Sequence, residues 1–308
     1  REDFRGALAN LRGQISHRID LPLQGRDGDA ALDLVYELVD ALLNTATKPL
    51  LGIGIGSPGL VDAANGVLQQ SVNLNWRYID FRTLLEKRYD LPVYMANDSQ
   101  VGAFAMYTFG KRYEDDLPLV VINLGWGVGA GIIIDGHLLH GSPVGAGEIG
   151  HITVVSGGDQ CACGNYGCLE TIASSRAIIR RVRMLAEENP RSSINNLVTE
   201  TNEINMRTVM TALEAGNEDV RQVIIEAGEA LGITAANLVG VVGSCRILLR
   251  GSVAQFGQLL LDPMREELDR RALPSLARAT ELDIASVGSD IVIQGASALI
   301  LHNELGVL

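Results

Sequence analysis

One short stretch of the chain gathers side chains that bind metal ions. It carries one histidine and three of the chain's four cysteines, in the spacing H-x9-C-x-C-x4-C. These residues are His151, Cys161, Cys163 and Cys168. Three thiolates and one imidazole form a ligand set that structural Zn²⁺ takes in closed tetrahedral sites. The glycines between the sulfurs suit a chain that needs positive φ or close backbone approach around one ion. The spacing therefore predicts a zinc knuckle.

Two other interpretations of these residues stay open. One is a pair of reduced core cysteines beside an unrelated surface histidine, and the other is a disulfide, which would leave one of three clustered cysteines unpaired. If zinc binds, three thiolates and a divalent ion leave a net charge of about −1, and the four ligands leave no open position for water. The site is therefore expected to be structural rather than Lewis-acidic.

Polar side chains flank this stretch and also follow a strand earlier in the chain. Glu148 and Glu170 bracket the stretch. Asn97 and Asp98 come directly after an apolar run at 91–96 that predicts a strand, and open α/β sheets bind ligands at the carboxyl ends of their strands. Alternatively, Asp98 or its serine neighbour is a helix N-cap. The pair is thus a candidate ligand site with a structural alternative.

Length and charge limit the class of protein. The 308 residues are enough for two domains, and the hydrophobic content of 47% and charged content of 20% are typical of a soluble globular protein. A net charge of −12 argues against a nucleic-acid-binding surface in these residues. No apolar run approaches the roughly 20 residues of a membrane span, and no leader opens the chain. The fourth cysteine, Cys245, gives no sign of an oxidising compartment, so we predict a cytoplasmic protein.

Hydrophobic periodicity predicts alternating strands and helices. Strands are expected as a hairpin over 6–23, singly at 51–56, 91–96 and 246–250, and as a pair over 119–141. Helices are expected over 30–43, from residue 97, and over 171–188, 206–215, 220–242 and 259–272. The segment 290–305 is expected to form a strand and then a helix rich in small residues. Strands and amphipathic helices in this order predict an α/β fold.

Two glycine-rich stretches allow both a ligand and a packing interpretation. Gly52, Gly54 and Gly56 leave one face of a strand without side chains, which favours close packing, and no nucleotide-binding motif follows. The stretch 125–131 has glycine at every second position. Its backbone N–H groups could face a phosphate, or the glycines could form only a tight hairpin.

Five motifs, taken in order, resemble the ROK family of repressors, uncharacterised reading frames and sugar kinases. They are G-I-G-S-P-G-L-V-D, N-D-S, G-W-G-V-G-A-G, E-I-G-H and C-A-C-G-N-Y-G-C-L-E. The likeness covers essentially the whole chain, and H-x9-C-x-C-G-x-x-G-C-x-E is highly specific. It implies an actin/hexokinase-like (ribonuclease H-like) α/β fold of two lobes with a sugar cleft between them. We place the lobes at 1–116 and 117–308, the knuckle at 151–168, and the last helix back on the first lobe.

The resemblance also implies a set of sugar contacts. They are Asn97, Asp98, Glu148, His151, Glu170, Gly59 and Asn73. In kinase members the aspartate that matches Asp98 is the general base, which accepts the proton of the attacking hydroxyl. His151 would bind zinc through one ring nitrogen and a sugar hydroxyl through the other. Glu170 lies two residues beyond the last sulfur, so the metal would position it.

Departures from the family pattern bear on ATP. Kinase members begin with a D-x-G-G-T phosphate loop, and nothing before Gly6 supplies it. Trp126 stands where kinases place a threonine that bonds ATP phosphates, and an indole offers a bulky apolar body with one donor. The pair of glycines on the adenosine side reads Arg250-Gly251-Ser252. These changes count against ATP binding, whereas the implied sugar residues are intact.

This combination resembles the regulator branch, such as the xylose and N-acetylglucosamine repressors. We expect a sugar effector, DNA contacts through an N-terminal helix-turn-helix that is not in this sequence, and a homodimer or homotetramer without membrane contact. The alternative is an ATP- and Mg²⁺-dependent hexose or N-acylhexosamine kinase with Asp98 as its base. A sugar-binding protein with neither activity is a third possibility.

Overall fold

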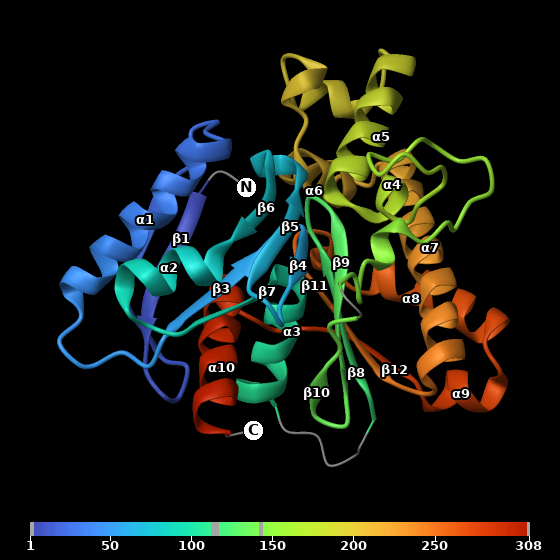
Figure 1. Cartoon of the computed structure of the whole chain (residues 1–308). Helices are drawn as coiled ribbons and strands as arrows, with labels where there is room; N and C mark the ends of the chain where they lie inside the picture. The colour runs from blue at the N-terminus through green and yellow to red at the C-terminus, as the bar shows by residue number, and fades with distance from the viewer. Residues whose placement is uncertain (1–2, 112–116, 142–143, 307–308) are drawn as a thin grey trace. The chain divides into compact units, whose positions relative to one another are not determined.

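The computed structural model describes residues 3–111, 117–141 and 144–306, which fold into two compact units (Figure 1). Unit 1 consists of Arg1–Asp116, Gly131–Gly147 and Val287–Leu308. Unit 2 consists of Leu117–Ala130 and Glu148–Ser286. Each unit is therefore assembled from segments that are distant in sequence. The lobe boundaries given above stay a prediction.

In the described part of unit 1, the strands before residue 98 form three small sheets. β1 (Asp3–Ala9) and β2 (Ile15–Pro22) pair antiparallel, which confirms the predicted hairpin. β3 (Ile53–Ser57) and β7 (Val93–Asn97) pair in parallel. β4 (Leu60–Asp62), β5 (Val67–Ser71) and β6 (Trp76–Asp80) form an antiparallel sheet that periodicity did not predict. Its residues Leu68 and Trp76 are buried with Phe81 in one apolar cluster.

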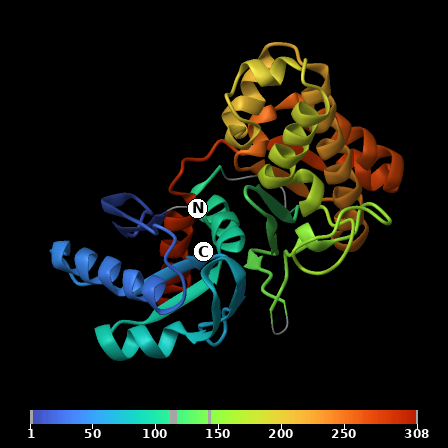
Figure 2. The same cartoon turned by 90° about the horizontal axis from the view of Figure 1, so that it is seen from above.

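Of the α-helices in the described residues, four belong to unit 1: α1 (Gly28–Thr45), α2 (Phe81–Tyr89), α3 (Asp98–Phe109) and α10 (Ile291–Leu305). In Figures 1 and 2, α10 (red) lies beside α3 (teal). A Cβ on Gly54 of β3 would stand 2.1 Å from the Ala296 carbonyl oxygen. The glycine face of β3 therefore serves close packing against α10, which is the packing interpretation given above.

The strand expected at the start of segment 290–305 is wrong. The structure has one continuous helix from Ile291 to Leu305. A run of three apolar, β-branched residues, at positions 291–293, fits a buried strand and a buried helix equally well, because both can be apolar all round. Packing against α3 and β3 favours the helix here, and only small residues let it approach them so closely.

A five-stranded sheet has the strand order β10-β9-β8-β11-β12, and the boundary between the units falls within β9, so that β8, β11 and β12 belong to unit 2 and β10 to unit 1. β8 (Leu119–Leu124) and β9 (Val128–Ile134) confirm the predicted pair, and β10 (His137–Leu138) extends it. β11 (Arg246–Arg250) pairs in parallel with β8 and with β12 (Glu281–Ile284), a strand that was not predicted.

The helices of unit 2 are α4 (Glu170–Ala173), α5 (Ser175–Glu188), α6 (Met206–Glu214), α7 (Glu218–Val242), α8 (Gln258–Arg271) and α9 (Pro274–Ala279). Figure 2 shows α5 to α8 gathered beside one another. The helix predicted over 171–188 is interrupted at Ser174, whose hydroxyl caps α5 by accepting the Ala177 N–H. The length and composition of α7 would suit a membrane span, but 67% of its apolar window is buried, which is typical of a core helix.

Candidate metal and ligand site

The four predicted metal ligands come together in unit 2. Their ligand atoms all lie within 4.8 Å of one another. Cys163 Sγ is 3.8 Å from Cys168 Sγ, and Cys161 Sγ is 3.6 Å from His151 Nδ1. Zinc–sulfur bonds of about 2.3 Å in a tetrahedron place two sulfurs about 3.8 Å apart. The spacing of the donors is therefore consistent with a zinc site.

The loop that carries the cysteines folds around this cluster with help from its glycines. Gly164 and Gly167 have φ of +95° and +69°, in the left-handed region that favours glycine. A Cβ on Gly167 would stand 1.7 Å from the Val155 carbonyl oxygen. Both reasons given for these glycines, positive φ and close approach, are confirmed. All three cysteines are free, so the disulfide alternative is wrong.

The thiols differ in acidity because they differ in surroundings. Burial, the largest cause, and the neighbouring thiols together raise the pKa of Cys168 to about 12. Burial also acts to raise the pKa of Cys163, but hydrogen bonds from the Asn165 backbone and from the other two thiols outweigh it and hold that pKa below its ordinary value. Cys163 is thus more easily converted than Cys168 to the thiolate that a metal requires.

Glu148 and His151 lie side by side at the edge of the cluster. The short helical turn Ile149–His151 begins after Glu148, and His151 Nε2 is 3.9 Å from Glu148 Oε2. Since Nδ1 faces Cys161, the two ring nitrogens point to different partners. Each side chain is about one third exposed, at 35% and 33%. One nitrogen can therefore bind a metal while the other and the carboxylate reach a polar ligand.

Glu170, the first residue of α4, is already engaged by its neighbours. Its Oε2 accepts the Val128 backbone N–H at 3.0 Å, and its Oε1 pairs with Arg176 at 3.1 Å. Its side chain is 13% exposed. A carboxylate has about four acceptor positions, so capacity for another donor remains. Sequence reasoning missed both partners, because spacings of 42 and 6 residues match no local pattern.

The other predicted sugar contacts belong to unit 1. Asn97 caps α3 by accepting the Ser99 N–H at 2.8 Å and donates to the Gly59 carbonyl at 2.9 Å. The N-cap is therefore Asn97 rather than Asp98 or Ser99. Asp98 is the first residue of α3 and only 6% exposed, and it accepts the Ser99 hydroxyl at 3.3 Å. Asn73 is exposed on the helical turn Val72–Leu74.

Gly59 is held close to a neighbouring strand. Its φ is +103°, and a Cβ there would stand 2.1 Å from the Gln70 carbonyl oxygen. The structure thus joins Gly59 to Asn97 within unit 1. It joins Glu148 and His151 to the cysteines, with Glu170 two residues beyond the last of them, within unit 2.

An α/β fold of two units, with parallel strands β8-β11-β12 in one and a His/Cys₃ cluster whose spacing is consistent with a metal site, is that of an actin/hexokinase-like protein. The model of the ROK family matches residues 1–303. The chain belongs to the ROK family.

Similar proteins fall into two functional groups. A xylose repressor of Caldicellulosiruptor bescii is 30% identical over 286 residues, which are 91% of this chain and 71% of the repressor. A glucokinase of Halalkalibacterium halodurans is 32% identical over 303 residues, which are 97% of this chain and 92% of the kinase. A crystal structure of a ROK family transcriptional regulator, a homologue of the E. coli MLC protein, has a TM-score of 0.85 at 29% identity and covers 96% of this chain and 74% of its own.

Proposed function

We propose that this chain is the sugar-sensing body of a ROK-family transcriptional regulator. The observation that carries the proposal is Trp126, at the turn between β8 and β9, whose side chain is 53% exposed. Kinase members of the family place a threonine here that bonds ATP phosphates. An indole has no hydroxyl, carries one N–H donor and occupies far more space, so it disfavours a triphosphate at this turn.

The proposed effector is a small neutral sugar. Glu148 and His151 offer an acceptor and a ring nitrogen at the surface of unit 2, and Glu170, two residues beyond the last cysteine of the cluster, keeps acceptor capacity. Asn97, Asp98, Gly59 and Asn73 are the proposed contacts from unit 1. Sugars are recognised by groups of this kind, because each hydroxyl both donates and accepts a hydrogen bond.

We assign the metal cluster a structural zinc ion held by His151, Cys161, Cys163 and Cys168. The spacing of donors supports zinc, and four protein ligands leave no position for water. When bound, the ion would hold the His151 ring and the start of α4 in place. DNA would be bound by a helix-turn-helix outside these 308 residues, since the net charge is −12, and half-site spacing would be set by a homodimer or homotetramer.

A sugar titration with an activity assay tests the function. We expect calorimetry with hexoses, pentoses and N-acetyl sugars to find one class that binds, without sugar-dependent release of ADP from ATP and Mg²⁺. Asp98→Asn should weaken that binding at least about tenfold, because hydrogen bonds to a charged acceptor are the stronger ones. Asp33→Asn, the same charge change on an exposed residue of α1, is the matched control and should bind as the unaltered protein does.

The second candidate is an ATP-dependent sugar kinase. It is favoured by the glucokinase relative, of which this chain covers 92%, and by the position of Asp98, buried directly after β7 as a general base could be. Sugar-dependent ADP release that stops on Asp98→Asn would establish this candidate and overturn the regulator proposal.

A further inference from the structure

The turn between β8 and β9 is hydrogen-bonded at both of its ends to the segment 170–175 of unit 2. The Gly125 carbonyl accepts the Ser175 N–H at 2.8 Å, and the Val128 N–H donates to Glu170 Oε2 at 3.0 Å. Within the turn, the Gly125 N–H donates to the Gly127 carbonyl at 3.0 Å. The turn that presents Trp126 therefore depends on contacts from the start of α4 and the start of α5.

Gly127 is the residue that lets the Glu170 carboxylate come so close. A Cβ on Gly127 would stand 2.5 Å from Glu170 Oε2. The φ of Gly127 is not positive, so this glycine is required for space rather than for backbone conformation. The contact thus depends on both residues. Gly127 has no side chain to occupy the space, and the Glu170 side chain, which is 13% exposed, fills it.

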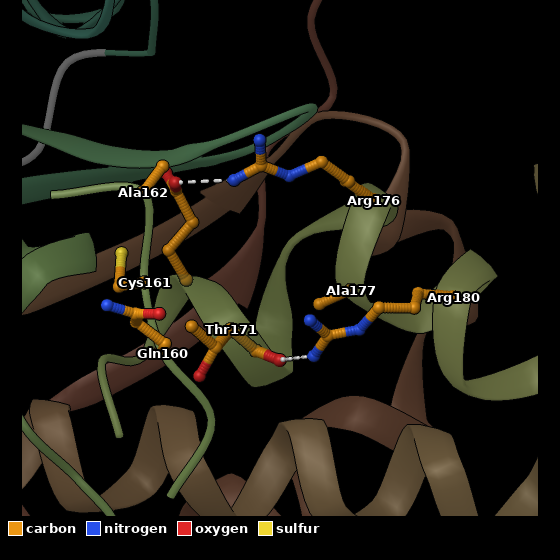
Figure 3. Close-up of a pocket in the computed structure, with 8 residues that line it drawn as sticks. Gln160, Cys161, Ala162, Thr171, Arg176, Ala177 and Arg180 are labelled. Carbon is orange, nitrogen blue, oxygen red and sulfur yellow. Dashed lines mark hydrogen bonds and ion pairs between the residues drawn. The ribbon is translucent and has the colours of Figure 1, made fainter. Parts of the chain in front are cut away.

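Arg176 holds the same carboxylate from the other side. Its guanidinium pairs with Glu170 Oε1 at 3.1 Å in a cavity of about 290 Å³. Figure 3 shows Arg176 and Arg180 extending from α5 along this cavity. A largely buried carboxylate is stable only when its charge and its acceptor positions are matched, and Arg176 supplies a matching charge. Glu170 therefore stands between a cation on α5 and a backbone N–H of the turn.

The residues that precede Glu170 are held in place next to the His/Cys₃ cluster. Cys168 is fully buried and only two residues before Glu170. Its carbonyl accepts the Thr171 hydroxyl at 2.7 Å, and the Leu169 N–H donates to the Ile152 carbonyl at 2.9 Å. The short backbone segment from Cys168 to Glu170 is thus held by hydrogen bonds and has little freedom to move.

From these contacts we propose that Glu170 is a positioning residue for the β8–β9 turn. Through Glu170, the order of the turn and of Trp126 is coupled to the His/Cys₃ cluster. This role is separate from any contact that Glu170 makes to a sugar. The coupling of the turn to the His/Cys₃ cluster rests on the proposed metal site. Neither the coupling nor the positioning role of Glu170 depends on the regulator assignment. Loss of either the carboxylate or the metal should release the turn.

Two readouts test the proposal in the full chain. The first is amide hydrogen exchange of peptides that cover Val128. The second is acrylamide quenching of tryptophan fluorescence, which reports mainly on Trp126, because the only other tryptophan, Trp76, is 4% exposed. We expect Glu170→Ala to speed exchange in the turn at least about tenfold and to increase quenching. Glu170→Gln keeps an oxygen for the Val128 N–H and should restore most of the protection.

Controls separate this role from a general loss of structure. Glu188→Ala, at the exposed end of α5, should change neither readout. Removing the metal with a chelator should release the turn in the unaltered protein as Glu170→Ala does. The proposal is overturned if Glu170→Ala leaves the turn protected, if Glu170→Gln behaves like alanine, or if chelation has no effect on a metal-loaded sample. Metal analysis of the sample shows separately whether the zinc assignment itself fails.

Discussion

Replacing Cys168 by serine is expected to lower the free energy of unfolding by several kcal/mol and to abolish binding of one zinc ion per chain. Cys168 is fully buried, and its Sγ lies 3.8 Å from Cys163 Sγ, so the sulfur is a central ligand. Serine is a poor ligand for zinc, and because a metal site does not exist in the unfolded chain, lost metal affinity is lost folding free energy. Urea unfolding and metal analysis measure the two effects together.

Cys245→Ser is the matched control for this change. Cys245 is buried as fully as Cys168, just before β11, but lies outside the cluster. Burying a serine hydroxyl in an apolar site costs about 1–3 kcal/mol, so this variant should be destabilised by less and should keep its metal. Zinc missing from protein prepared without a chelator would contradict the assignment, as would equal losses of stability in the two variants with metal retained in both.

The metal cluster could be predicted from the sequence because its chemistry is local. The ligands at positions 161, 163 and 168 lie within eight residues, and a chain that short can bring its side chains to one point without help from the rest of the fold. Only His151 comes from outside, and it is still ten residues away. The structure brings the ligand atoms of all four within 4.8 Å of one another, as the predicted set requires, and zinc binding by them stays a prediction.

The contacts of Glu170 could not be predicted in the same way. Its acceptor bond to Val128 spans 42 residues and depends on how α4 packs beside the β8–β9 turn. The sequence shows a glycine at position 127, but a tight hairpin turn is enough to explain it. Nothing in the sequence indicates that a carboxylate lies where a Cβ of residue 127 would be. Long-range partners of a functional residue require the fold.

The fold itself was predictable where a pattern was long and periodic. The 25-residue helix α7 and the hairpin β1–β2 are of this kind. The strands β4 and β12 have three and four residues, too few for a period to emerge. At the start of α10 the apolar run is compatible with both elements, and packing against α3 selects the helix.

That packing leads to a second large effect, in unit 1. Gly295→Ala is expected to lower the free energy of unfolding by roughly 3 kcal/mol, the upper end of the cost of overpacking. The new Cβ would stand 1.9 Å from the Val101 carbonyl oxygen and 2.8 Å from Val101 Cγ1. Alanine has a helix propensity better than that of glycine by about 1 kcal/mol, which is too little to offset a clash with backbone. Thermal or urea unfolding measures the change.

Gly240→Ala separates the effect of the steric clash on stability from the effect of helix propensity. Gly240 lies in α7, and no neighbouring atom comes within 4 Å of the position that an added Cβ would take. Only the helix propensity therefore acts there, and this variant should be more stable by up to about 1 kcal/mol. Gly295→Ala should also weaken sugar binding, because relief of the clash must move α3, whose first residue is Asp98. If both variants gain stability alike, α10 does not approach α3 so closely, and Asp98 is not positioned by that contact.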